Sequence, residues 1–336
     1  MAKFLPGKKN AITDLDGVKV GHLTANKDLS SPSGEKVSIR TGLTAILPYP
    51  MEKELRLFMG SFILKGMNEM TGYQVGDDFC YLNSPIVLTN PFNVGVAYDT
   101  VLSYGFSLNR IEIWPPLVLG VNDSFLNDMK ASLLKENDIL DTFRKASEES
   151  VEEGSVGIGL GLRAYGHKGG IGTASRLIDL ANKKFTCGVL VASNHSNPGS
   201  LALPNDELDA NQNEEGSFTI IVGVDIPLVP FQIKRIMRCL VFGLSPILQL
   251  NTSSDSLTCI FFSTANSMVI QEEGPMLFDF RIIKDLYEDK IIQAGKEAVQ
   301  GALINSLLKA TYVQGREGRK CETISEEKIH RLIKNS

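Results

Sequence analysis

The chain is poor in the residues from which metal sites, disulfide frameworks and nucleic-acid surfaces are built. Its 336 residues include only four histidines and one tryptophan, and aromatic residues make up 7%. The five cysteines are scattered, odd in number and without a C-x-x-C pair, which indicates reduced thiols in a cytosol. With 39 acidic against 34 basic residues, the net charge is −5. The sequence therefore predicts no His-rich metal site and no nucleic-acid partner.

Long apolar runs are also missing. No stretch approaches the roughly 18–20 apolar residues that cross a bilayer. Residues 1–17 (MAKFLPGKKNAITDLDG) lack the apolar segment of a secretory signal. We therefore expect a cytoplasmic protein without a membrane partner. Hydrophobic residues make up 43% of the chain, enough for a large domain with a substantial core.

Short apolar stretches bounded by turn residues alternate with segments in which apolar residues recur at i, i+3 and i+4. This alternation predicts an α/β architecture in one continuous domain, residues 1–336. The expected strands are residues 43–47, 85–88, 117–119, 185–192, 218–224 and 257–262. The expected helices are residues 54–70, 94–104, 230–242 and 290–311.

Two motifs partly resemble known metal-binding, catalytic or phosphate-binding motifs, but their sequences favour ordinary turns. In residues 14–17 (DLDG), a calcium loop fails because Lys19 stands where Gly is needed and Ala25 where Glu is needed. The preceding residues are too polar for the buried strand that leads into a phosphatase nucleophile, so we expect a tight turn between two edge strands. The glycine-rich residues 154–176 lack both the G-K-[ST] ending of a phosphate loop and the acid of a dinucleotide fold. They favour a packed turn that lines a site.

Gly216 and Ser217 join a polar, acidic stretch (residues 205–216) to an apolar strand. This is how a self-cleaving N-terminal nucleophile is presented. Cleavage would give Ser217 a free α-amine with a pKa of about 7.7–8.0, so one residue would supply both nucleophile and base. By spacing alone, a Gly-Ser pair before a strand is usually just a turn.

Two further segments carry side chains suited to the same chemistry. Asn194 follows an expected strand, where its amide can donate to an oxyanion or simply form a turn. Residues 251–256 (NTSSDS) place hydroxyls beside a carboxylate, which suits either the orientation of a nucleophile or a solvated loop.

Taken in order, these motifs closely resemble the L-aminopeptidase/D-amidase-esterase family, which includes the β-peptidyl aminopeptidases. The resemblance runs from about residue 12 to residue 315. The matching segments are residues 12–22 (ITDLDGVKVGH), 41–48 (TGLTAILP), 85–90 (PIVLTN), 168–176 (KGGIGTASR), 188–191 (GVLV), Asn194, Gly216-Ser217, 227–230 (PLVP), 232–235 (QIKR) and 262–266 (FSTAN).

The resemblance implies a four-layer αββα sandwich, similar to the N-terminal-nucleophile hydrolases and related to the ornithine acetyltransferase fold. It implies self-cleavage between Gly216 and Ser217 into an α chain, residues 1–216, and a β chain, residues 217–336. It implies no metal and no cofactor. The family also suggests a homo-oligomer, a tetramer of αβ units.

By motif position, the resemblance makes Ser217 the nucleophile and Asn194 the oxyanion donor. The family's Ser-x-acid pair, which steadies the nucleophile, falls on Ser253 and Asp255. About two extra residues separate this acid from the motif at 262–266. Ser254 or Ser256 is therefore an alternative to Ser253.

One departure from the family concerns substrate binding. The family usually has a Glu that binds the substrate's free ammonium, followed two residues later by an aromatic residue. Here Gly120 and Asn122 stand at these positions. We therefore expect weakened recognition of free amines, unless Asp123 or Asp128 replaces the missing acid.

The sequence thus predicts a self-processing serine hydrolase that cleaves amide or ester bonds of small peptides or amides through an acyl-enzyme on Ser217. Two alternatives share the same residues. One is a non-catalytic or weakly catalytic ligand-binding relative that has lost the ammonium-binding carboxylate. The other is an acyltransferase.

Overall fold

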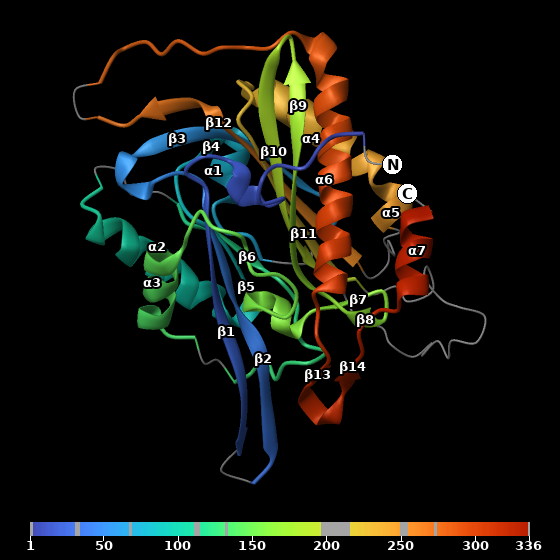
Figure 1. Ribbon diagram of the computed structural model, residues 1–336. Helices are drawn as coiled ribbons and strands as arrows, with labels where there is room; N and C mark the ends of the chain where they lie inside the picture. Colours follow the sequence, from blue (N-terminus) through green and yellow to red (C-terminus); the bar gives the residue numbers. More distant parts are fainter. Residues whose placement is uncertain are drawn as a thin grey trace.

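The computed structural model describes residues 3–30, 34–66, 69–110, 115–131, 134–195, 216–248, 255–271 and 274–334. Two sheets form its centre (Figure 1). The four-stranded sheet has the order β1 (Lys19–Ser30), β2 (Lys36–Leu47), β5 (Ile86–Thr89), β6 (Leu117–Gly120). The six-stranded sheet has the order β4 (Tyr81–Leu82), β3 (Leu55–Ile63), β12 (Asp255–Val269), β11 (Gly216–Val224), β10 (Lys183–Ser193), β9 (Gly170–Leu180). Two short ribbons pair β7 (Arg163–Ala164) with β8 (His167–Lys168) and β13 (Val313–Gln314) with β14 (Lys320–Cys321).

Helices contact both sheets from outside. α2 (Val94–Ser107) and α3 (Glu136–Lys145) contact the four-stranded sheet, whereas α4 (Pro230–Gly243) and α6 (Glu288–Leu308) contact the six-stranded sheet (Figure 1). α6 lies close to β9 because Gly172 has no side chain: a Cβ there would lie 1.9 Å from the carbonyl oxygen of Ala302. The shorter helices are α1 (Tyr73–Asp78), α5 (Ser245–Leu248) and α7 (Glu326–Lys334).

The central strands of the six-stranded sheet are buried on both faces. Successive side chains of a strand point to opposite faces. Ile221 and Ile260 therefore join the apolar cluster shared with the other sheet, and Ile220 and Phe261 join the cluster beneath α4 and α6. Burying such a side chain contributes about 1.5–3 kcal/mol. This two-sided burial explains why the sequence shows uninterrupted apolar runs here.

The mixed α/β pattern is confirmed, with one wrong element. The expected helices at 94–104, 230–242 and 290–311 correspond to α2, α4 and α6, and all six expected strands are present. The expected helix at 54–70 is wrong, because its first half forms β3. Its apolar residues fit both periods, and antiparallel pairing with β12 decides in favour of a strand.

The two motifs assigned to turns need correction. Within residues 154–176, a short 3-10 helix (Gly157–Gly161) and β7 and β8 are followed by β9, so the last third of the motif is strand. Residues 14–17 end a 3-10 turn (Ile12–Asp14) and precede β1, so the turn does not connect two edge strands. Among the helices of the described ranges, none is both long and apolar enough to span a membrane.

Candidate active site

Ser217 is the second residue of β11, between β10 and β12. Its relative exposure is 1%. β11 runs parallel to β12, with Gly216 opposite Asp255 and Ser217 opposite Ser256. The polar stretch 205–216 lies outside the described residues except for Gly216, which already belongs to the strand. The nucleophile predicted from sequence is therefore held by a buried sheet.

Two donors converge on the hydroxyl oxygen of Ser217. The backbone N–H of Asn122 donates to Ser217 Oγ at 2.9 Å, and Asn194 Nδ2 donates to the same atom at 3.0 Å. Asn194 Nδ2 also donates to the carbonyl oxygen of Asn122 at 2.5 Å. Since Oγ accepts both bonds, its own proton is directed elsewhere. The two donors hold the hydroxyl oxygen of Ser217 in place, and donors beside a nucleophilic oxygen are also near the carbonyl oxygen of a group that it attacks.

Contacts with the backbone of Arg163 set the orientation of the Asn194 side-chain amide. Asn194 follows the end of β10, and its Oδ1 accepts from the backbone N–H of Arg163 at 3.4 Å. The N–H of His195 donates to the carbonyl oxygen of Arg163 at 2.8 Å. These contacts place the amide oxygen toward Arg163 and the NH2 group toward Ser217.

Gly120 is the last residue of β6, and Asn122, two residues later, contacts Ser217. Asn122 reaches Ser217 through its backbone, while its Oδ1 accepts from the N–H of Ser124 at 3.0 Å. Gly120 donates its N–H to the carbonyl oxygen of Glu69 at 2.8 Å. A Cβ at position 120 would lie 3.4 Å from Pro91 and 3.5 Å from the nitrogen of Glu69, ordinary contact distances. Position 120 therefore has room for the first atom of a side chain.

Asp123 is a buried carboxyl directly behind Asn122. Asn127 Nδ2 donates to its Oδ1 at 3.1 Å. Burial raises the pKa of Asp123 to about 7, against the opposing effect of the Thr41, Asn127 and Asn90 side chains. The side chain of Asp123 is 1% exposed and is held by these hydrogen bonds, so it is not placed to reach a substrate ammonium.

Asp123→Asn is expected to remove a pH dependence of stability. The native carboxyl keeps its proton up to about pH 7, whereas the unfolded one releases it near 3.8. The native state binds more protons between these values, so the stability of the wild type falls as the pH rises through this window. Between pH 4 and pH 8, the free energy of unfolding of Asp123→Asn should therefore rise by about 2–4 kcal/mol relative to that of the wild type. Urea unfolding at both pH values measures this, and parallel pH profiles would contradict it.

The peptide bond proposed for cleavage has a donor of its own. Ser256 Oγ donates to the carbonyl oxygen of Gly216 at 3.2 Å. Ser253 and Ser254, the other hydroxyls considered from sequence, lie outside the described residues. Because Ser256 is opposite Ser217 in the parallel register, the structure brings this hydroxyl to the Gly216 carbonyl.

Asp255 lies one residue from Ser256, and alternation along β12 directs its side chain to the opposite face. Its Oδ2 is 3.5 Å from His195 Nε2, and both side chains are 0% exposed. The His195 ring stacks on Tyr165, with centroids 4.6 Å apart, and burial raises the pKa of Tyr165. The structure thus joins Asp255 to two residues that the sequence analysis did not select. His195 had one available signal, its place directly after Asn194.

Lys168 is a further residue that the sequence analysis missed. Its ammonium is fully buried and donates to the carbonyl oxygens of Gly159, Leu162 and Gly169 at 2.7, 2.9 and 2.7 Å. Burial lowers the pKa of Lys168 to about 7. These bonds fix the turn that leads into Arg163, and through it the Asn194 amide.

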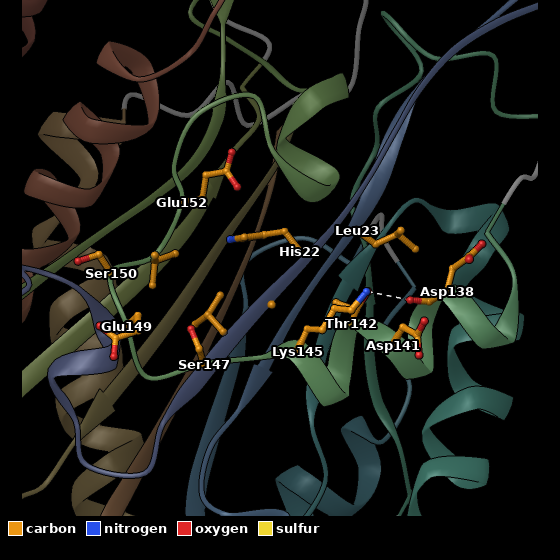
Figure 2. A pocket seen from close by; sticks show the side chains of 13 residues that line it. His22, Leu23, Asp138, Asp141, Thr142, Lys145, Ser147, Glu149, Ser150 and Glu152 are labelled. Atoms are coloured by element: carbon orange, nitrogen blue, oxygen red, sulfur yellow. Dashed lines mark hydrogen bonds between the residues drawn. The ribbon is translucent and has the colours of Figure 1, made fainter.

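A separate cleft lies between β1 and α3, with a volume of about 350 Å³ (Figure 2). The carboxylates of Asp138, Asp141, Glu149 and Glu152 line it together with His22, whose pKa burial lowers to about 4. None of Ser217, Asn194 or Asn122 lines this cleft. Over the described part of the chain, no cluster of three His, Cys, Asp or Glu side chains is arranged to hold a metal ion.

Comparison with known proteins gives consistent matches over almost the whole chain. The model of peptidase family S58 matches residues 10–321. The β-peptidyl aminopeptidase BapA of Sphingosinicella microcystinivorans is 28% identical over 355 residues, covering 98% of this chain and 89% of that protein.

Two solved structures have closely similar folds. One is a protein of Pyrococcus horikoshii, 32% identical, with a TM-score of 0.87 and coverage of 98% of this chain and 96% of that one. The other is the L-aminopeptidase D-Ala-esterase/amidase of Ochrobactrum anthropi, described as a prototype of the serine aminopeptidases and a variant of the Ntn hydrolase fold. It is 28% identical, with a TM-score of 0.86 and coverage of 99% and 95%.

Proposed function

Because the chain belongs to peptidase family S58, it is a self-processing serine hydrolase with an N-terminal nucleophile, and we propose that Ser217 is that nucleophile. The resemblance inferred from the sequence motifs is confirmed. The matches favour a hydrolase over a ligand-binding relative or an acyltransferase. The observation that carries the assignment of Ser217 is the pair of donors, Asn122 N–H and Asn194 Nδ2, on its Oγ.

The first reaction in this proposal is self-cleavage into residues 1–216 and 217–336. Ser217 Oγ attacks the carbonyl carbon of Gly216, the C–N bond breaks, and the proton of the hydroxyl passes to the departing nitrogen. Water then hydrolyses the resulting ester, which leaves a carboxylate on Gly216 and a free amine on Ser217. Ser256 Oγ supports this step because it donates to the oxygen that becomes negative.

The second reaction is hydrolysis of the substrate. The freed α-amine of Ser217 removes the proton from its own hydroxyl, which attacks the substrate carbonyl. Asn194 Nδ2 stabilises the oxyanion, together with the N–H of Asn122. The leaving amine or alcohol takes the proton, and water releases the acyl group from Ser217. No step in this scheme requires a metal or a cofactor.

Two residues assist the nucleophile in this proposal. Ser256, in contact with the Gly216 carbonyl, is the hydroxyl that the described residues favour. Ser253, which motif position indicates, and Ser254 stay alternatives. Asp255 lies opposite Gly216 in the sheet and supplies the acid of the Ser-x-acid pair. Its side chain contacts His195, the residue after Asn194.

The substrate is proposed to be a small peptide or amide. The relatives' names point to aminopeptidase and amidase or esterase activity. A carboxylate opposite a buried substrate ammonium forms a strong, charge-assisted bond, and Gly120 cannot supply one. Asn122, with its side-chain oxygen bound to Ser124, offers only a neutral amide.

Gly120→Glu is therefore expected to raise kcat/KM for a free-amino amide at least about tenfold relative to its acetylated analogue. The wild type should prefer the acetylated substrate. Glu69, whose backbone pairs with Gly120, offers the matched control Glu69→Gln. A wild type that prefers the free amine by tenfold and loses this preference in Glu69→Gln would show that Glu69 has replaced the missing acid.

Three broader expectations also belong to the proposal: the layered fold, the cytoplasmic location and the homo-oligomer. The contacts of α2 and α3 with one sheet and of α4 and α6 with the other support a four-layer αββα sandwich. Its relation to the ornithine acetyltransferase fold is proposed from the motif resemblance. We further propose a cytoplasmic homo-oligomer, a tetramer of αβ units.

Intact-mass spectrometry of the purified protein tests the self-cleavage step. The wild type should give two fragments that divide between Gly216 and Ser217. Ser256→Ala should cleave more slowly, roughly 10-fold or more, because the scissile carbonyl loses its donor. A wild-type chain that stays whole after long incubation would exclude the mechanism, and an unchanged rate in Ser256→Ala would remove Ser256 from it.

A further inference from the structure

The imidazole of His195 is enclosed between a carboxylate and an aromatic ring. Its Nε2 lies 3.5 Å from Oδ2 of Asp255, and its ring stacks on that of Tyr165 with the planes 20° apart. The Tyr165 hydroxyl donates to the carbonyl oxygen of Ile247 at 3.2 Å. The three side chains are buried, with relative exposures of 1% for Tyr165, 2% for His195 and 1% for Asp255. We call Tyr165, His195 and Asp255 the His195 clamp.

The His195 clamp is one residue away from the proposed oxyanion donor. Asn194 Nδ2 donates to Ser217 Oγ at 3.0 Å. The next residue, His195, has its ring against Asp255. The backbone of Arg163 contacts both neighbours: its carbonyl oxygen accepts from the N–H of His195 at 2.8 Å, and its N–H donates to Asn194 Oδ1 at 3.4 Å. Because the two residues share one peptide bond, a shift of Asn194 away from the serine would also pull His195 from its contacts.

The His195 clamp would also connect the two chains that self-cleavage produces. In that product, Asn194 and His195 belong to the α chain. Ser217 and Asp255 belong to the β chain. Asp255 pairs with Gly216 in the parallel register, so its contact with His195 crosses between the chains beside the cut. A displacement of about 1 Å in a catalytic group can lower a rate by about 10²-fold. The oxyanion donor therefore needs an anchor that does not depend on the cleaved bond.

We propose that His195 is a positioning residue that holds the Asn194 amide in place for catalysis. It acts through Asn194 and not on the substrate itself. An imidazole suits this role, because its face stacks on an aromatic ring while a ring nitrogen at its edge meets a carboxylate. This proposal rests on Ser217 being the nucleophile and on Asn194 being the oxyanion donor.

Two variants of similar size separate the polar contact of His195 from its bulk. His195→Gln keeps an N–H donor for Asp255, whereas His195→Leu fills the space without a donor. We measure kcat and KM with an N-acetylated 4-nitroanilide and divide the rates by the fraction of cut chain that intact-mass spectrometry gives. His195→Leu should lower kcat by about tenfold or more, with a smaller change in KM. His195→Gln should retain at least about threefold more kcat than His195→Leu. Equal kcat values in the two variants would overturn this role of His195.

The double variant Asn194→Ala/His195→Leu tests whether His195 acts through Asn194. Residues that act as a unit have non-additive effects on rate. Once the amide is removed, His195→Leu should change kcat by less than about threefold. A loss in the double variant equal to the product of the two single losses would show that the residues act independently, and would contradict the proposal.

Ser193→Ala is the matched control on the other side of Asn194. The buried Ser193 Oγ accepts from the N–H of Gly170 at 3.0 Å and from Ser306 Oγ at 2.8 Å. Its removal should lower the denaturant concentration at which the protein unfolds, but it should leave kcat within about threefold of the wild type. The same loss of kcat in Ser193→Ala and His195→Leu would show that any loosening at the end of β10 has this effect, and would exclude a specific role for His195.

A structural measurement separates this proposal from the proposed function, because it does not require an active protein. Crystal structures of the wild type and of His195→Leu, or of His195→Gln if the Leu chain does not fold, give the distance from Asn194 Nδ2 to Ser217 Oγ. This distance should be longer in the variant than the 3.0 Å of the native arrangement. An unchanged distance would overturn the positioning role, whether or not the protein is active. A longer distance, together with normal activity in Asn194→Ala, would support the positioning of Asn194 and exclude it as the oxyanion donor of the proposed function.

Discussion

Ser217→Ala is expected to yield one uncut chain and to lower the rate of hydrolysis by about 10⁴-fold or more, the loss typical of removing a catalytic serine. The methyl group cannot attack the Gly216 carbonyl, so the α-amine that acts as base is never released. The fold should persist, because Ala fits a strand position that is 1% exposed. Mass spectrometry and rates with an activated amide measure both effects.

Variants that keep a nucleophilic atom provide the matched control. Ser217→Thr and Ser217→Cys retain a hydroxyl or a thiol, so both should still cleave the chain, although more slowly than the wild type. Cleavage in these two and not in Ser217→Ala would tie the reaction to the side-chain atom. Cleavage of the Ala variant at the same bond would point to a contaminating protease and would contradict self-processing.

Asn194→Ala is expected to lower kcat by roughly 10²–10³-fold, the cost of deleting one oxyanion donor. The N–H of Asn122 would remain on Ser217 Oγ, so some activity should survive. KM should change much less than kcat, because the bond strengthens mainly when charge develops on the oxygen.

The variant Asn194→Asp removes the side-chain N–H donor while it nearly keeps the size of the side chain. The carboxylate has nearly the same size and keeps an oxygen for the N–H of Arg163, but it has no N–H to donate. It should therefore lose at least as much activity as the Ala variant, and it should unfold at a lower denaturant concentration because its buried carboxylate faces the carbonyl oxygen of Asn122. A loss of less than about threefold in Asn194→Ala would reduce Asn194 to a turn residue.

Local pattern was enough for much of the architecture and for the main candidates. A buried strand gives a continuous run of apolar residues, as at 218–224, and an amphipathic helix gives an apolar repeat, as at 290–311. Both patterns can be read from a single sequence. The motifs around Gly216-Ser217 and Asn194 led to the family that the comparisons confirm. The same local reasoning was wrong at 54–70, since a stretch that fits two periods is decided by its neighbour, here β12.

The contacts that complete the site were decided by tertiary structure alone. A backbone N–H has no sequence signature, so the donor from Asn122 appears only when β6 ends beside β11. The position of Ser256 opposite Ser217 depends on the register between β11 and β12, which hydrogen bonds and side-chain packing set. Asp255, His195 and Tyr165 come from distant parts of the chain and meet only after folding. The sequence by itself determined the family and led to Ser217 as the proposed nucleophile, because both inferences depend on local motifs. The fold decided which groups surround that residue, because pairing across long sequence separations depends on the whole packed structure.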